Sequence, residues 1–263
     1  MTTNIYWHEP TMRNDGVVPT LLAIGDSWFW YPLPGGSLAS SLARLVAPRQ
    51  HAILAFGNNG AEAFDYVNGV YADGIDRALD RYGSGLSAVF VSGGGNDFAG
   101  FNDLRPLLGL DCSACTAADD CFNHGALPGD LEELFDRVQS YHIELFDSIA
   151  ARVPAGARIF VHNYDYAIPT GKGVFGKGWL KPALLAARVP APLHAACVRV
   201  LIDAFSERLR ALEVRYAGRV VFVDSRGTLS PSEWANELHP KGAGFDHLAD
   251  ARWRPALSAA GLA

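Results

Sequence analysis

The sequence contains no long hydrophobic run, no dense cluster of lysine or arginine, and no repeated or low-complexity segment. Without an apolar run of roughly 18–20 residues, it offers no candidate for a membrane-spanning helix. The net charge of −6 and the scattered basic residues give no electrostatic footprint for nucleic acid. Residues 1–16 lack the apolar core of a secretory signal peptide. We therefore expect a cytoplasmic protein, with export left open for a mature form.

The sequence has an incomplete version of one nucleotide-binding motif and lacks the nucleophile motif of one hydrolase fold. Segment 171–178, Gly-Lys-Gly-Val-Phe-Gly-Lys-Gly, resembles a phosphate-binding loop, but Gly178 stands where a Ser or Thr should bind Mg²⁺. Pro182 also interrupts the helix that should follow such a loop. The Gly-x-Ser-x-Gly elbow of α/β-hydrolases is absent. These absences argue against nucleotide binding and against that hydrolase fold.

The chain has only four cysteines, and Cys112, Cys115 and Cys121 fall in one short polar stretch. Three thiols so close together can form a disulfide or bind zinc, with His124 or Cys197 as the fourth ligand. A structural zinc site normally offers two close pairs of ligands, and this stretch offers one. A disulfide is therefore favoured over zinc, free thiols remain open, and in each case we expect a structural role.

Hydrophobic residues make up 49% of the 263 residues and charged residues 19%, as in a globular protein with a substantial core. Five short apolar runs indicate buried strands, and the segments between them show helical periodicity. The expected strands are 21–24, 52–56, 88–92, 158–162 and 220–224, and the expected helices are 37–45, 61–82 with a break near Gly69, 131–151, 193–216 and 242–257. This alternation predicts an α/β fold, a three-layer α/β/α sandwich around a five-stranded parallel sheet.

Two connecting segments, 98–130 and 164–192, are longer than ordinary loops. Both follow expected strands, so they should emerge beyond the carboxyl edge of the sheet. We expect a single domain over residues 1–263 in which these insertions either wall the site or decorate the fold, for example as an oligomer contact. The sequence does not set the oligomeric state.

The run 21–24 ends in a Gly-Asp-Ser turn that presents Ser27 at the rim of the expected sheet. Gly60 follows the second strand, Asn96 follows the third, and His239 follows the fifth. Because ligands of parallel sheets bind beyond the carboxyl ends of the strands, these four residues are expected to converge. Acyl transfer requires a nucleophile, a base and donors to an oxyanion, and this set supplies all three.

Ser27 is the predicted nucleophile and His239 the predicted general base. The backbone N–H groups of Ser27 and Gly60 and the side-chain amide of Asn96 are predicted to form the oxyanion hole. Glycine suits position 60 because the missing side chain lets its N–H approach a substrate closely.

These blocks resemble those of the SGNH, or GDSL, hydrolase superfamily. The resemblance covers residues 20–245 and rests on Gly25-Asp26-Ser27, Gly60, Gly95-Asn96-Asp97 and His239-Pro240, in the expected order. It implies a flavodoxin-like sandwich and a serine esterase or lipase that forms an acyl-enzyme without a metal or other cofactor. The implied substrate is a small ester, or an acylated lipid or glycan. Asp26 and Asp97 are predicted to be structural and to accept hydrogen bonds from loop N–H groups.

The superfamily's last block reads Asp-x-x-His, whereas Asn236 stands at the position of its aspartate. An asparagine can accept a hydrogen bond from the imidazole N–H but adds no charge to stabilise an imidazolium. Three explanations are open: Asn236 orients a Ser–His dyad, a carboxylate such as Glu237 or Asp224 takes its place, or the site is impaired. We favour the dyad because the other groups are complete.

Several aromatic residues are candidates for the substrate pocket because their rings offer large apolar faces with few polar tips. Some of them are expected to pack in the core instead. The candidates are Trp28, Phe29, Trp30, Tyr31, Phe175 and Trp179. The favoured function is hydrolysis of carboxylic esters, followed by carbohydrate O-deacetylation. A non-catalytic protein that binds lipid or glycan in an impaired site is the alternative of a different class.

Overall fold

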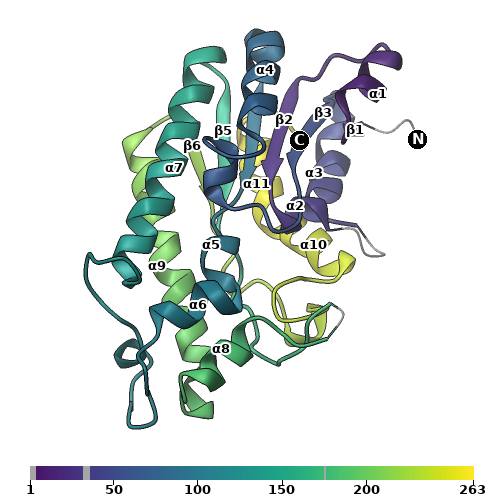
Figure 1. The fold of residues 1–263 in the computed structure, drawn as a ribbon. Helices are drawn as coiled ribbons and strands as arrows, with labels where there is room; N and C mark the ends of the chain where they lie inside the picture. Colours follow the sequence, from purple (N-terminus) through teal and green to yellow (C-terminus); the bar gives the residue numbers. More distant parts are fainter. Residues whose placement is uncertain (1–3, 32–35, 175) are drawn as a thin grey trace.

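The computed structural model describes residues 4–31, 36–174 and 176–263. Within them, a parallel sheet carries helices on both faces, which confirms the three-layer α/β/α sandwich (Figure 1). The strands are β1 (Ile5–Tyr6), β2 (Leu21–Gly25), β3 (Ile53–Gly57), β4 (Ala88–Ser92), β5 (Arg158–His162) and β6 (Val220–Val223). They lie in the order β1-β3-β2-β4-β5-β6. The sheet is deeply buried, and every residue of β2 and β4 is buried.

The sheet has six strands rather than the five expected from the sequence. The additional strand is β1, whose Ile5 and Tyr6 pair in parallel with Ile53 and Leu54 of β3. Two residues carry no readable period, so the sequence pattern cannot distinguish this strand from a loop. It forms because it continues the ladder at the edge of β3 and buries the Tyr6 side chain.

The helices form two layers. On one face lie α3 (Leu38–Val46), α10 (Gly242–Leu248) and α11 (Arg254–Ala259), and on the other lie α4 (Ala72–Tyr82), α7 (Leu131–Arg152) and α9 (His194–Arg215) (Figure 1). A short helix α1 (Glu9–Asn14) follows the edge strand β1. A five-residue π-helical turn, Ala249–Trp253, links α10 to α11 within the expected helix 242–257.

The expected helix 61–82 is correct only from Ala72 onward. Residues Ala63–Tyr66 form a 3₁₀ turn, and α4 begins after Gly69. The turn is held in place because Glu62 and Asp65 form a capping box and the Asp97 carboxylate accepts a hydrogen bond from the Ala63 N–H. These tertiary contacts outweigh the local helical pattern.

Both long insertions contain helices. The first insertion contains α6 (Phe101–Leu107), directly after α5 (Asn96–Ala99), and then a 3₁₀ turn at Asp119–Cys121. The second insertion contains α8 (Leu180–Ala186). These helices gather beyond the end of the sheet at which β2 leads into α2, Ser27–Trp30 (Figure 1). The insertions thus add a wall beside the carboxyl edge of the strands. Among the described residues, no helix has the length and apolar character needed to cross a bilayer.

Candidate active site

The sheet reverses its strand order at β2, which lies between β3 and β4. Such a switch point is where open parallel sheets bind ligands. The chain turns sharply here, because Gly25 ends β2 and Asp26 caps α2 by accepting a hydrogen bond from the Trp28 N–H at 3.0 Å. A Cβ at Gly57, which has φ +109°, would lie 1.9 Å from the Gly25 carbonyl oxygen. The close approach of these two glycines leaves Ser27 at the rim of the sheet.

The structure brings Ser27, His239 and Asn236 into one chain of hydrogen bonds. The Nε2 atom of His239 lies 2.8 Å from the Ser27 Oγ, and its Nδ1 atom lies 3.0 Å from the Asn236 Oδ1. All three side chains are largely buried. The distances match those expected between a nucleophile, its base and the group that orients the base.

The orientation of the Asn236 amide follows from its other partners. Its Oδ1 atom also accepts hydrogen bonds from the Leu238 N–H at 3.0 Å and the His239 N–H at 2.9 Å. Its Nδ2 atom donates to the Tyr31 hydroxyl at 3.2 Å. Reversing the amide would place its NH₂ group against two N–H donors. The oxygen therefore faces His239, which holds the proton on Nδ1 and leaves Nε2 free to accept from Ser27.

The His239 ring is enclosed by two aromatic side chains. Tyr31 stacks on it at 4.5 Å with an interplanar angle of 18°, and Trp179 meets it edge-on at 5.8 Å and 77°. Burial lowers the pKa of His239 to about 4, because the charged imidazolium is poorly solvated there. At neutral pH the ring is therefore uncharged and able to accept a proton.

The buried Glu237 carboxylate points away from this dyad and binds the start of α8. It accepts hydrogen bonds from the backbone N–H groups of Leu180 at 2.8 Å and Lys181 at 3.1 Å, and also from those of Gly171 and Trp179. The first residue of the segment 171–178 and the three residues that follow the segment thus bind a carboxylate of their own chain. A Cβ at Gly178 would lie 2.2 Å from the Glu237 Oε2 atom, which explains the glycine at that position of the segment.

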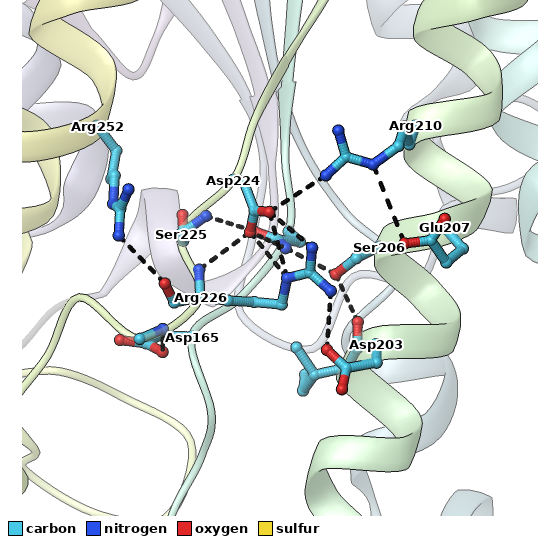
Figure 2. A network of polar contacts seen from close by, with 12 residues as sticks. Asp165, Asp203, Ser206, Glu207, Arg210, Asp224, Ser225, Arg226 and Arg252 are labelled. Carbon is cyan, nitrogen blue, oxygen red and sulfur yellow. Dashed lines mark hydrogen bonds and ion pairs between the residues drawn. The ribbon is translucent and has the colours of Figure 1, made fainter.

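The Asp224 carboxylate, at the end of β6, is also engaged elsewhere. Figure 2 shows it between Arg226 and Arg210, and the Asn163 amide donates to it at 2.8 Å. Burial alone would raise the pKa of Asp224, but the hydrogen bonds from Arg226 and Asn163 outweigh it and bring that pKa to about 2. Because both His239 nitrogens already have partners, neither Glu237 nor Asp224 stands in for the missing aspartate.

The predicted oxyanion donors lie around the same rim. Asn96 begins α5 and lines one cavity together with Ser27. Its Nδ2 atom donates to the Ala61 carbonyl at 2.8 Å, which fixes the amide and leaves its second N–H available. Gly60 directly precedes Ala61 and has φ +80°, and its N–H donates to none of the described residues. The Ser27 N–H lies in the first turn of α2, where backbone N–H groups have no helical partner.

Asp26 and Asp97 make the loop contacts predicted for them. Asp97 accepts from the Ala63 N–H at 3.0 Å, and Asp26 accepts from the Trp28 N–H and from the Ser92 hydroxyl at 2.9 Å. Asp26 also accepts from the Tyr164 hydroxyl, which in turn accepts from the Gly95 N–H at 3.1 Å. Burial raises the pKa of Asp26 to about 6, against the lowering effect of these hydrogen bonds.

Tyr164 and Ser92 were not found by sequence reasoning. Tyr164 comes two residues after β5, and Ser92 is the last residue of β4. Both therefore occupy the same edge of the sheet as Ser27, and that placement is the signal that could have identified them. Tyr164 joins the turn after β2 to the turn before Asn96 through the hydrogen bonds of its hydroxyl group and through the packing of its ring against Trp28.

A small cavity of about 40 Å³ opens beside Ser27 and Asn96. Its wall is mainly apolar and comes from α2, α8, α9 and the loop before His239. The wall residues include Trp28, Leu180, Val198, Leu201, Trp234 and Leu238. The residues from α8 and α9 carry no sequence signal for this role, since helix periodicity alone makes them part of an ordinary apolar face.

The aromatic candidates separate into different environments. Trp28 lines the cavity and donates from Nε1 to the Leu238 carbonyl at 2.9 Å, whereas Phe29 is fully buried in the core against Trp253. Trp30 packs against Trp7 at the edge of the sheet, away from the cavity. Tyr31 and Trp179 contact His239, as described above, and Phe175 lies outside the described residues.

Comparisons with known proteins identify the fold. No protein-family model and no curated protein sequence matches the chain. Among solved structures, an extracellular lipase from Streptomyces rimosus superposes with a TM-score of 0.56 and 18% identity, covering 92% of this chain and 100% of that one. Phospholipase A1 from Streptomyces albidoflavus gives 0.52 and 17%, covering 92% and 99%. A protein from Bacteroides ovatus assigned as a GDSL-like lipase gives 0.50 and 14%, covering 91% and 52%.

Proposed function

We propose that this chain, which has the fold of SGNH/GDSL hydrolases, is a serine hydrolase that cleaves carboxylic esters. The observation that carries the proposal is the contact of 2.8 Å between the Ser27 Oγ and the His239 Nε2, with Asn236 on the other ring nitrogen. The structural neighbours named as lipases and a phospholipase act on esters, which supports the same class of reaction here.

The proposed reaction has two halves. The Ser27 Oγ attacks the ester carbonyl while the His239 Nε2 takes the hydroxyl proton, and the same imidazolium then gives that proton to the departing alcohol. Water repeats the sequence on the acyl-enzyme and releases the carboxylic acid. The N–H groups of Ser27 and Gly60 and the Asn96 amide would stabilise the oxyanion that forms in each half.

Asn236 supplies part of what a triad aspartate supplies. Its oxygen accepts from the His239 Nδ1 at 3.0 Å and so keeps the tautomer that the reaction needs. It adds no negative charge to stabilise the imidazolium. This argument supports a working Ser–His dyad over an impaired binding protein, because the contacts of an active base are intact.

The cavity favours a small acyl group. Its volume of about 40 Å³ is small, and its apolar wall suits a methyl or short alkyl chain. A short-chain ester is therefore the preferred substrate class. The same size also supports carbohydrate O-deacetylation as the second candidate, since an acetyl group is the smallest acyl group that offers an apolar end.

The deciding experiment measures hydrolysis of p-nitrophenyl esters from acetate to long chains by wild type, Ser27→Ala and Ser258→Ala. Ser258 is an exposed serine of α11 and serves as the matched control. We expect activity on the shortest chains that is lost in Ser27→Ala and kept in Ser258→Ala. Activity that persists in Ser27→Ala would refute the assigned nucleophile.

A covalent probe separates a selective enzyme from an inactive one. A fluorophosphonate reports a reactive serine without depending on the correct acyl chain, and peptide mass spectrometry locates the modified residue. Labelling at Ser27 in wild type and its loss in His239→Ala are the expected results. A folded wild-type protein that neither hydrolyses any ester nor takes the label would establish the non-catalytic alternative instead.

A further inference from the structure

Three of the four cysteines form a cluster in the first insertion, and none of the four lines the cavity beside Ser27. The Sγ atoms of Cys112, Cys115 and Cys121, in the first insertion, lie within 4.8 Å of one another. Cys197 is on the buried face of α9 and outside this group of three, and its Sγ lies 3.9 Å from the carbonyl oxygen of Ala118, three residues before Cys121. The fold thus brings a residue of a distant helix to the three clustered thiols.

This arrangement has the chemistry of a closed metal site. Thiolates are preferred ligands of zinc, and a Cys-x-x-Cys pair such as Cys112 and Cys115 is a common half of a structural zinc site. With Zn–S bonds of about 2.3 Å, tetrahedral sulfurs lie roughly 3.8 Å apart, so small side-chain shifts bring the three clustered sulfurs to that spacing. Cys112, Cys121 and Cys197 are fully buried, which suits a site without bound water.

The structure also decides between the two candidates for a fourth ligand. The His124 ring lies between Glu132, whose Oε1 is 2.7 Å from Nδ1, and the Asp119 carbonyl, 3.1 Å from Nε2. Both nitrogens are therefore occupied by oxygen partners. Among the described residues, the buried Cys197 Sγ has only the long contact of 3.9 Å to the Ala118 carbonyl oxygen, so it is the more available ligand.

A disulfide fits the cluster less well. All four cysteines are free in the structure, and each of the three clustered sulfurs lies within reach of the other two. Proximity therefore singles out no pair, and one disulfide would leave two buried thiols behind. One ion, in contrast, can bind all three sulfurs at once.

We propose that Cys112, Cys115, Cys121 and Cys197 bind one structural zinc ion that fastens the first insertion to α9. Four thiols lose four protons and form four Zn–S bonds, with no change of oxidation state. The Cys112 N–H also donates to the Ala187 carbonyl at 2.8 Å, at the end of α8. The same ion would therefore brace α8, a wall of the cavity beside Ser27, independently of the proposed hydrolysis.

The first test combines metal analysis with intact mass. The protein is expressed without a polyhistidine tag in zinc-supplemented medium and purified without chelator. We expect about one zinc per chain by elemental analysis, and a denatured, metal-free mass equal to that of the fully reduced chain. A mass lower by one or two pairs of hydrogens would show disulfides and overturn the proposal, as would a metal-free protein with four titratable thiols.

Cobalt substitution and variants then locate the ligands. Cobalt(II) bound to wild type should give the thiolate charge-transfer and d–d bands of a tetrahedral sulfur site. Cys115→Ser and Cys197→Ser should each lose zinc to a competing chelator at least tenfold more readily than wild type. Ser113→Ala and His124→Ala should retain it, since Ser113 is exposed and His124 has other partners. Zinc binding unchanged in Cys197→Ser would remove that ligand, and if the variants do not fold, the cobalt spectrum of wild type decides.

Discussion

At the scale of single residues, the environment of His239 sets how the proposed chemistry responds to pH. Burial between Tyr31 and Trp179 lowers the pKa of His239 to about 4, well below the ordinary value of about 6.5. A general base works only when unprotonated, so activity should be lost as the pH falls through about 4. We expect kcat/KM for a short-chain ester to stay level from neutral pH down to about 5 and then to fall.

That profile is measured with an ester whose leaving group does not titrate in the range. Tryptophan fluorescence over the same range serves as the control for acid unfolding. A fall centred near pH 6.5 in a folded protein would contradict the buried, unprotonated imidazole.

The substitution Asn236→Asp tests how much a negative charge beside His239 would change the rate of hydrolysis. The aspartate keeps the acceptor for Nδ1 and adds a negative charge, which stabilises the imidazolium and raises the pKa of His239. The acid limb of kcat/KM should therefore move to higher pH. Because Asn236 already holds the tautomer, we expect the rate at neutral pH to change by no more than about tenfold, or about 1.4 kcal/mol. A gain of a thousandfold would mean that the native site is impaired.

Gly60→Ala has a matched control in Gly218→Ala. Both glycines have φ +80°, and a Cβ at either position would meet nothing within 4 Å. Each substitution should cost about 1 kcal/mol of stability for the left-handed backbone, measured by urea unfolding. Only Gly60→Ala should also lower kcat, by at least about tenfold, because a displaced N–H stabilises the oxyanion poorly. Equal activity in the two variants would remove Gly60 from the oxyanion hole.

At the scale of elements, Tyr164 couples the turns that carry Ser27 and Asn96. Tyr164→Phe removes the donor to Asp26 and the acceptor for the Gly95 N–H. We expect a loss of about 1–3 kcal/mol of stability for the unpartnered buried groups, and a fall in kcat with little change in KM as the two turns drift apart. Unfolding curves and steady-state kinetics on a short-chain ester measure both.

Tyr66→Phe is the control for this substitution. Tyr66 is also buried, and among the described residues its hydroxyl donates only to the Ser92 carbonyl, at 3.1 Å. Its removal should cost stability without lowering kcat to the same extent. If both variants lost kcat equally, Tyr164 would be a core residue rather than a positioning residue.

The sequence predicted those elements whose pattern is set locally. Strands such as 88–92 and 158–162 match the structure to the residue, because a strand buried on both faces is a continuous apolar run. The two-residue strand β1 and the 3₁₀ turn at 63–66 form through tertiary contacts, to β3 and to Asp97 respectively. No local pattern could reveal them.

At the scale of the whole molecule, the polar residues of the site could be predicted from the sequence, whereas the residues of the cavity wall could not. Ser27, Asn96 and His239 were predicted because chemistry restricts the residue types at those positions. The cavity wall was not predicted, because Leu180 and Leu201 look like ordinary apolar residues of helices in the sequence. Only the fold shows that they line the same cavity as Ser27. Asn236 lies between these cases: the sequence raised the question of its role, and the direction of its amide oxygen supports the proposed dyad.

Leu201→Ala tests whether this wall sets the acyl-chain preference. Leu201 is buried, and removing its branched end enlarges the cavity at a cost of about 2–5 kcal/mol of stability. The chain-length optimum should move toward longer esters. Leu209→Ala, equally buried on α9 but not part of the cavity wall, is the control and should lose stability without changing the optimum. An optimum unchanged in Leu201→Ala would place the acyl group elsewhere.

The proposed nucleophile and its base are separated by 212 positions in the sequence. During translation at about 5–20 residues per second, Ser27 would emerge roughly 10–40 seconds before His239. The nascent polypeptide would hold a serine without its proton acceptor throughout that interval. Ester cleavage would begin only once the last βα unit has docked.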